Sequence, residues 1–91
     1  RTAIGRAYYA AFLATKKRLE EQGGSFADIE RIHLEVIQEL MRRNTDLGNK
    51  LDTLRDKRID ADYRMGASIS PGLGQSCVRL SELVIHSLGH L

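Results

Sequence analysis

The chain has 91 residues, of which 42% are hydrophobic and 29% are charged, and its formal net charge is +2. This composition excludes a disordered tail, and no apolar run approaches the roughly 20 residues that span a bilayer, so we expect no membrane association. A chain of this size buries about two-thirds of its unfolded surface, which is enough for one modest core. We therefore expect a single domain over residues 1–91.

The single cysteine, Cys77, excludes an internal disulfide and favours a reducing, cytoplasmic setting. The helical pattern starts at once behind Arg1, so we expect a piece of a longer chain that is truncated at its N-terminus. Cations gather at 16–18, 42–43 and 55–58, but acids are interleaved after each group. That distribution is more typical of solvated helix faces than of bulk phosphate neutralisation.

Residues 2–21 are predicted to form a helix that ends at the glycine pair Gly23-Gly24. The helical period places six residues on one buried face: Ile4, Tyr8, Ala11, Phe12, Thr15 and Leu19. A second stripe consists of small residues that would let another helix approach closely: Ala3, Ala7, Ala10 and Ala14.

A second helix is predicted from about Phe26 to Arg43, because Ser25 and Asp28 have the spacing of a capping box. Its expected buried face comprises Ile29, His33, Val36, Ile37 and Leu40. Residues 44–49 are predicted to form a polar turn. A third helix is predicted over residues 47–64. A fourth is predicted to begin at Pro71, or else nearer Gln75 or Ser76, and to end near Gly89. Short connections between amphipathic helices imply an all-α, antiparallel up-down four-helix bundle.

The apolar stripe of the third helix is interrupted by charge. Leu47, Leu51 and Leu54 define the stripe, and its continuation falls on Arg58 and Asp62. A charge there must be paired, or the seam must open into a cleft. Arg58 and Asp62 therefore form either an ion pair at the rim of the bundle or a site in which Asp62 holds Arg58 toward a phosphate.

Further candidates surround this interruption. Tyr63 either completes the core or supplies a hydroxyl to the cleft, and Arg55 adds a second cation. His33 lies on an apolar face, where it is either a packed residue or a proton-transfer group. Tyr8 and Tyr9 are adjacent, so both cannot enter the same core, and Arg6 lies one turn before Tyr9.

No motif indicates a cofactor. The sequence has no phosphate-binding glycine loop, no nucleophile elbow and no Cys/His metal set. His86 and His90 have ligand-like spacing, but no carboxylate or cysteine joins them, so we expect surface residues and no metal.

Two motifs resemble the small prokaryotic HEPN-domain family. Residues 3–12 are similar to its Ala-Ile-x-Arg-Ala-Tyr-Tyr-Ala-x-Phe signature, and residues 58–63 are similar to its Arg-x-x-Ala-Asp-Tyr element. His33 matches a histidine that opens the second helix in that group. The resemblance implies a helical bundle that is frequently dimeric and often encoded beside a minimal nucleotidyltransferase as a toxin–antitoxin-like pair.

Many HEPN proteins are metal-independent ribonucleases whose catalytic element is an arginine followed after four to six residues by a histidine. Here Tyr63 stands after four intervening residues, and no histidine follows Arg55 or Arg58 within range. Our first hypothesis is therefore a homodimeric module that binds nucleotide or RNA phosphate through Arg6, Tyr9, Arg55 and Arg58.

Two alternatives remain. The first is a ribonuclease toxin with a variant catalytic site made of Arg58, Asp62, Tyr63 and His33. The second is a structural partner of the nucleotidyltransferase that docks through the alanine stripe.

Overall fold

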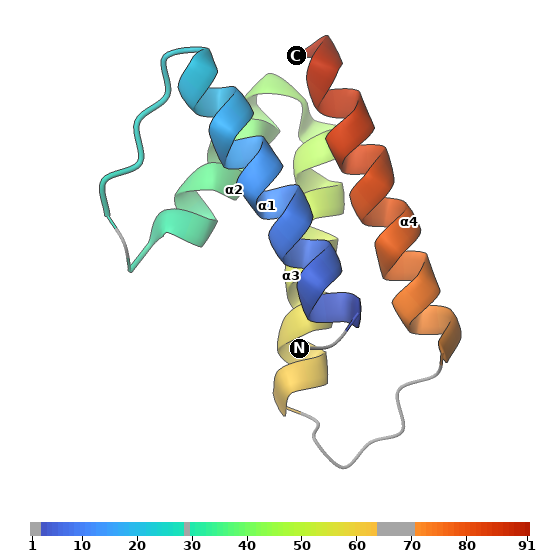
Figure 1. Cartoon of the computed structure of the whole chain (residues 1–91). Coiled ribbons are helices and arrows are strands. Elements are labelled where there is room, and N and C mark those ends of the chain that lie inside the picture. The colour runs from blue at the N-terminus through green and yellow to red at the C-terminus, as the bar shows by residue number, and fades with distance from the viewer. Residues whose placement is uncertain (1–2, 29, 64–70) are drawn as a thin grey trace.

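The computed structural model describes residues 3–28, 30–63 and 71–91, and the described part of the chain is helical without a strand. The helices are α1 (Ala3–Glu21), α2 (Ile32–Arg43), α3 (Thr45–Tyr63) and α4 (Pro71–Ser87), and a short 3₁₀ helix, η1 (Leu88–His90), closes the chain. They pack as a helical bundle (Figure 1). Among the described residues, no helix has the length and apolar character needed to cross a bilayer.

The predicted buried face of α1 is confirmed. All six residues of that face are buried, and they meet the apolar residues of the other helices in one core. Thr15 is the polar member, and its hydroxyl donates to the carbonyl of Ala11 at 2.7 Å, so no donor is lost by burial. The core contributions of the other helices are Val36, Ile37 and Leu40; Leu47, Leu51 and Leu54; and Cys77, Val84 and Leu88.

Small residues let α1 and α4 approach closely, and α4 is the helix with which α1 packs most extensively. The hydroxyl of Ser81 donates to the carbonyl of Ala7 at 2.7 Å, a contact that a larger side chain at either position would obstruct. Toward the start of both helices Gly74 faces Ala3, and toward their ends Arg18 Nε donates to the carbonyl of Leu88 at 3.1 Å. The two helices therefore run in the same direction.

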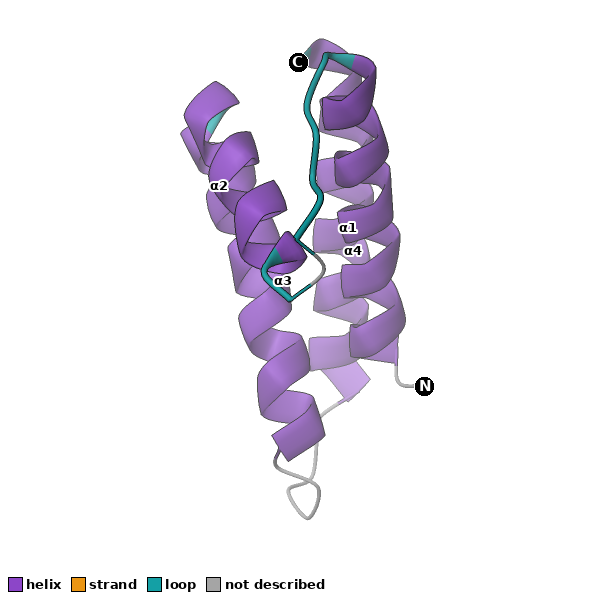
Figure 2. Ribbon diagram, turned by 90° about the vertical axis from the view of Figure 1, so that its left-hand side faces the viewer, coloured by secondary structure: helices purple, strands orange, loops and turns teal. Residues whose placement is uncertain are grey.

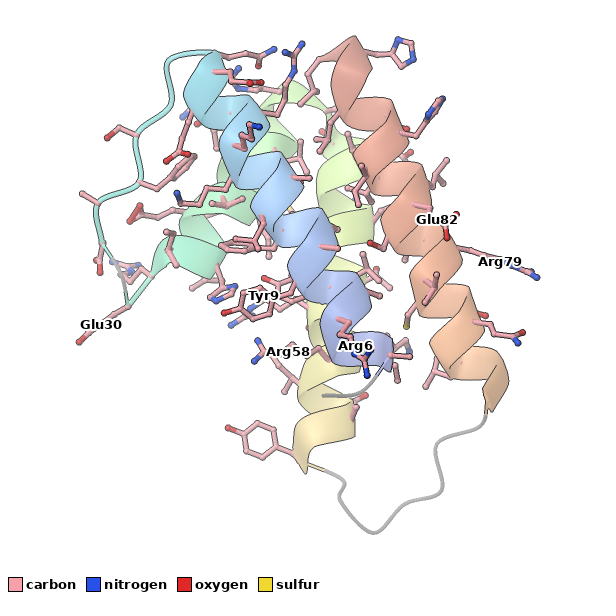
Figure 3. The ribbon with its side chains drawn as sticks, viewed as in Figure 1. Arg6, Tyr9, Glu30, Arg58, Arg79 and Glu82 are labelled. Carbon is pink, nitrogen blue, oxygen red and sulfur yellow. The ribbon has the colours of Figure 1, made fainter. Side chains whose placement is uncertain are left out.

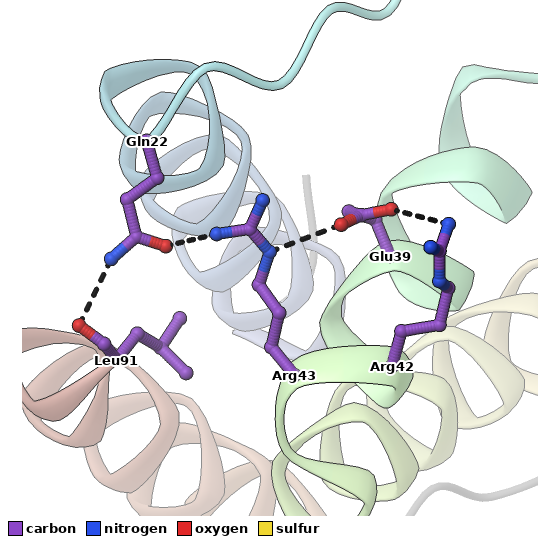
Figure 4. A network of polar contacts seen from close by, with 5 residues as sticks. All are labelled: Gln22, Glu39, Arg42, Arg43 and Leu91. Carbon is purple, nitrogen blue, oxygen red and sulfur yellow. Dashed lines mark hydrogen bonds and ion pairs between the residues drawn. The ribbon is translucent and has the colours of Figure 1, made fainter.

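Helix α2 is also parallel to α1. Tyr8 contacts His33 near one end of the pair, and Gln22 bonds to Arg43 near the other. At that second end a polar network ties α1, α2 and the last residue together (Figure 4). Glu39 accepts from Arg42 Nη1 at 3.2 Å and from Arg43 Nε at 3.0 Å, and Gln22 Nε2 donates to the carbonyl of Leu91 at 2.9 Å.

The expected up-down alternation of helix directions is therefore not what the structure shows. Helices α1, α2 and α4 run one way and α3 runs the other, in two layers that pair α1 with α4 and α2 with α3 (Figures 1 and 2). The long connection between α1 and α2 allows this arrangement, because residues 22–28 run back along the bundle before α2 begins at Ile32 (Figure 1). Ten extended residues can span about 33 Å. The stretch of α1 between Tyr8 and Gln22 measures only about 21 Å at 1.5 Å per residue.

The predicted start of the second helix at Phe26 is wrong, because α2 begins only at Ile32. Gly23 adopts a φ of 96°, and the N–H of Gly24 donates to the carbonyl of Leu19 at 2.8 Å, so α1 ends at the glycine pair as predicted. The carboxylate of Asp28 accepts from the backbone N–H of Glu30 at 3.1 Å and forms a local turn. Ile29, a predicted member of the buried face of the second helix, lies outside the described residues.

The turn between α2 and α3 is shorter than predicted. Asn44 alone separates the two helices, and its side-chain oxygen accepts from the N–H of Leu47 at 3.1 Å, as an N-cap does. The expected polar turn over residues 44–49 is therefore already helical from Thr45. This tight reversal presses Gly48 of α3 against Met41 of α2.

We predict that Gly48→Ala destabilises the fold. A Cβ at this position would lie 2.7 Å from the backbone N and Cα of Met41, which no side-chain rotation relieves. Overpacking of this kind costs about 1–3 kcal/mol, more than the gain of up to about 1 kcal/mol in helix propensity. Urea unfolding followed by circular dichroism measures the change.

The matched control is Gly72→Ala, in the first turn of α4, where a Cβ meets nothing within 4 Å. This variant should be as stable as the parent chain or more so. Equal stability of the Gly48 and Gly72 variants would contradict the close approach of α2 and α3.

Candidate functional site

The structure decides between the two adjacent tyrosines of α1. Tyr8 is fully buried and Tyr9 is 44% exposed, since neighbouring positions on a helix point about 100° apart. Their ring centroids are 6.3 Å apart in an edge-to-face arrangement. Tyr9 is thus at the surface, directly beside a buried phenol.

His33 completes an aromatic cluster with these rings. It lies in the first turn of α2, and its ring stacks on Phe12 with a centroid distance of 4.3 Å and on Tyr8 at 5.7 Å. Tyr9 meets the same imidazole edge-on at 6.3 Å. The Nδ1 atom of His33 lies 2.6 Å from the hydroxyl of Tyr8. We call Tyr8, Tyr9, Phe12 and His33 the aromatic cluster.

Arg58 of α3 covers this cluster. Its guanidinium carbon lies 5.8 Å from the ring centroid of Tyr8 and 5.5 Å from that of Tyr9, within the range of cation–π attraction. Figure 3 shows Arg58 and Tyr9 close together on one side of the bundle. The charge interruption in the apolar stripe of α3 therefore falls where α3 passes the tyrosines of α1.

Burial keeps both the Tyr8 phenol and the His33 imidazole neutral near pH 7. Burial raises the pKa of Tyr8 to about 12, although the positive charges of Arg55 and Arg58 oppose this shift. Burial also lowers the pKa of His33, and the charges of Arg58 and Arg55 lower it further. Arg55 is thereby close enough to act on the cluster, as a second cation on the same helix.

The other predicted site residues do not join the cluster. Arg6 lines a groove of about 400 Å³ between α1 and α4. Tyr63 is 85% exposed at the end of α3. The side chain of Asp62 lies outside the described residues, so its predicted pairing with Arg58 stays a prediction.

Of the predicted residues, the structure brings together Arg58, Tyr9 and His33, with Arg55 nearby. The sequence placed Tyr8 and Phe12 on the core line and left open which tyrosine reaches the site, but it did not indicate that both rings stack on His33. The sequence shows that Tyr8 and Phe12 are one helical turn apart, but this spacing does not indicate that α2 lies parallel to α1.

The described residues contain no group of three or more His, Cys, Asp or Glu side chains that could hold a metal ion. Comparison of the chain with protein-family models, with curated proteins and with solved structures finds no match.

We predict that His33 makes the fold sensitive to acid. In the unfolded chain its pKa is about 6.5, and folding lowers it, so below pH 6.5 the unfolded state binds the additional proton. Stability should fall as the pH drops from about 6.5 toward the lowered folded-state pKa. Chemical denaturation at pH 7.5 and pH 5.0 should show a smaller loss for His33→Gln than for the parent chain.

His86→Gln is the control, since that exposed histidine of α4 contacts His90 and lies outside the cluster. It should retain the parent's loss of stability on acidification. An identical loss in the parent and in His33→Gln would contradict the neutral state of this half-buried histidine.

Proposed function

We propose that the chain is a HEPN-like domain that binds the phosphate of a nucleotide or RNA at Arg58, Tyr9 and His33. The observation that carries this proposal is the position of the Arg58 guanidinium beside both tyrosine rings, one of them exposed. The residues concerned come from three different helices, so they form a site only in the folded chain.

The contacts of Arg58 suit phosphate binding. The cation–π contacts involve the positive charge of the guanidinium, whereas donation to phosphate uses its N–H groups, so the two interactions are compatible. The rings also restrict the long arginine side chain, which lowers the entropy lost when a ligand is bound. Arg55 adds positive charge in the preceding turn of α3.

Tyr9 suits a base. Single-stranded RNA is commonly bound by stacking its bases on exposed aromatic side chains, and each stacked base contributes about 1–3 kcal/mol. The exposed ring of Tyr9 lies next to Arg58, so one nucleotide could place its base on Tyr9 and its phosphate at Arg58. Two cations predict a shallow salt dependence, with about one or two phosphates neutralised.

The resemblance to HEPN proteins supports the same assignment. Tyr9 belongs to the first motif, Arg58 to the second and His33 lies between them, and the fold gathers all three. A toxin–antitoxin-like module with a minimal nucleotidyltransferase is the setting that the resemblance implies. A ribonuclease remains the alternative activity of this site.

We predict that Arg58→Ala weakens the binding of a short single-stranded RNA by about tenfold or more, because hydrogen bonds to charged groups contribute about 1.5–3 kcal/mol. Arg58→Lys keeps the charge but loses the planar fork, so it should bind with intermediate affinity. Fluorescence anisotropy with labelled oligonucleotide measures both.

Arg79→Ala is the matched control, because Arg79 is an exposed arginine of α4 far from Tyr9 (Figure 3). Its affinity should be close to that of the parent. If Arg58→Ala stays folded and binds RNA as well as the parent does, the phosphate site is excluded. Cleavage of RNA by metal-free protein that is lost in Arg58→Ala would favour the ribonuclease.

A second candidate function, that of a protein partner, is favoured by the groove between α1 and α4. Its lining is mainly apolar, and Val78 and Ile85 are 38% and 39% exposed. Arg6 on α1 and Glu82 on α4 border it with opposite charges (Figure 3). A second copy, related by a two-fold axis along the helices, would bring Arg6 of each chain toward Glu82 of the other.

We predict a dimer at micromolar concentration by light scattering, in which Arg6→Glu or Glu82→Arg weakens association through like-charge repulsion. The double variant restores opposite charges across the two-fold axis and should recover the dimer. A monomeric parent chain, or a double variant no better than the single ones, would exclude this interface.

A further inference from the structure

We infer that Tyr8 is a positioning residue that holds the proton of His33 on Nε2, so that the aromatic cluster presents hydrogen-bond donors to an intact phosphate. This inference rests on the proposed function, because it specifies how the same site meets its ligand. It assigns a role to a buried phenol that otherwise serves only the core.

The first step is the direction of the hydrogen bond between Tyr8 and His33. The two atoms are 2.6 Å apart, and no other hydrogen bond of the Tyr8 hydroxyl is found in the part of the chain that the structure describes. Tyr8 is fully buried, so water does not replace a missing acceptor. The phenol therefore donates to Nδ1, and Nδ1 is the acceptor.

The second step is the orientation of the imidazole ring. His33 stacks on Phe12 at 4.3 Å with an interplanar angle of 28°, and it also stacks on Tyr8. A flip of the ring would place a C–H group against the Tyr8 hydroxyl and leave that buried donor without an acceptor. The hydrogen bond and the stacking thus select the same ring position.

The third step is the charge state. The pKa of Tyr8 is raised to about 12 and that of His33 is lowered, so the phenol keeps its proton and the imidazole is neutral near pH 7. A neutral imidazole has one donor nitrogen and one acceptor nitrogen. Since Nδ1 accepts from Tyr8, the proton resides on Nε2, which points away from Tyr8 by the geometry of the ring.

The consequence concerns the ligand. Nε2–H and the guanidinium of Arg58 are both donors, and they complement the oxygens of a phosphate. A general base would need an unprotonated nitrogen to remove a proton from a ribose hydroxyl, and neither nitrogen of this ring is available for that task. His33 therefore serves this site as a donor to phosphate and not as a general base.

The tautomer can be measured directly. In nitrogen-15 NMR spectra of the ligand-free chain at pH 7.5, the His33 ring should show the Nε2–H tautomer. Tyr8→Phe removes the donor and should give a mixture of both tautomers. It should also weaken AMP binding by about threefold to tenfold, as expected for a hydrogen bond of about 1 kcal/mol.

Phe12→Leu is the control, because it removes the stacked ring but keeps the Tyr8 hydroxyl, so Nε2–H should persist.

An Nδ1–H tautomer or a mixture in the parent chain would overturn the inference. Because this spectrum needs no variant, the test stands even if Tyr8→Phe does not fold. Unchanged AMP affinity in a folded Tyr8→Phe variant would also overturn it. The failure of the proposed function looks different: AMP and RNA then bind with equal affinity to the parent and to Arg58→Ala, whatever the tautomer.

Discussion

The contact between Tyr8 and His33 joins the first two helices, and the candidate site depends on it. The hydrogen bond and the stacked rings place the first turn of α2 against the middle of α1. Arg58 then approaches the same rings from α3. Without the contact of Tyr8 with His33, Arg58 and Tyr9 would still meet, but no histidine would lie beside them.

Helix α1 serves two sides of the molecule through different residue types. Its aromatic residues face α2 and α3, where they surround His33 and Arg58. Its alanines face α4, where Ser81 bonds to the backbone of α1 and a shallow groove remains beside the contact. The large rings of α1 contact side chains of α2 and α3 and so form the site, whereas its small residues let the backbones of α1 and α4 approach each other.

Binding and catalysis at this site would require opposite properties of His33. A base needs a nitrogen that accepts a proton, whereas the structure turns Nδ1 of His33 toward the phenol of Tyr8. The positive charges of Arg55 and Arg58 also lower the pKa of His33, which disfavours the doubly protonated ring that would act as an acid. The surroundings of His33 thus favour a neutral hydrogen-bonding role.

The sequence by itself determined the helical fold and most of its buried faces. Periodicity identified the core line of α1. Glycine and proline signals identified the end of that helix at the glycine pair and one of two possible starts of α4, at Pro71. Periodicity also singled out Arg58 as a charge on an apolar stripe. The helical period placed Tyr8 on the core line, but which of Tyr8 and Tyr9 faces the site could not be predicted from it, because a buried ring can still contact groups from other helices.

Only the tertiary structure decided the directions of the helices and therefore the composition of the cluster. The apolar faces of α1 and α2 are compatible with parallel or antiparallel packing, and the connection over residues 22–31 is long enough for the parallel choice. That choice places His33 beside Tyr8 and Phe12. An antiparallel α2 would present the same buried face but carry His33 toward the other end of α1, because the direction of a helix is set by its connection and its partners.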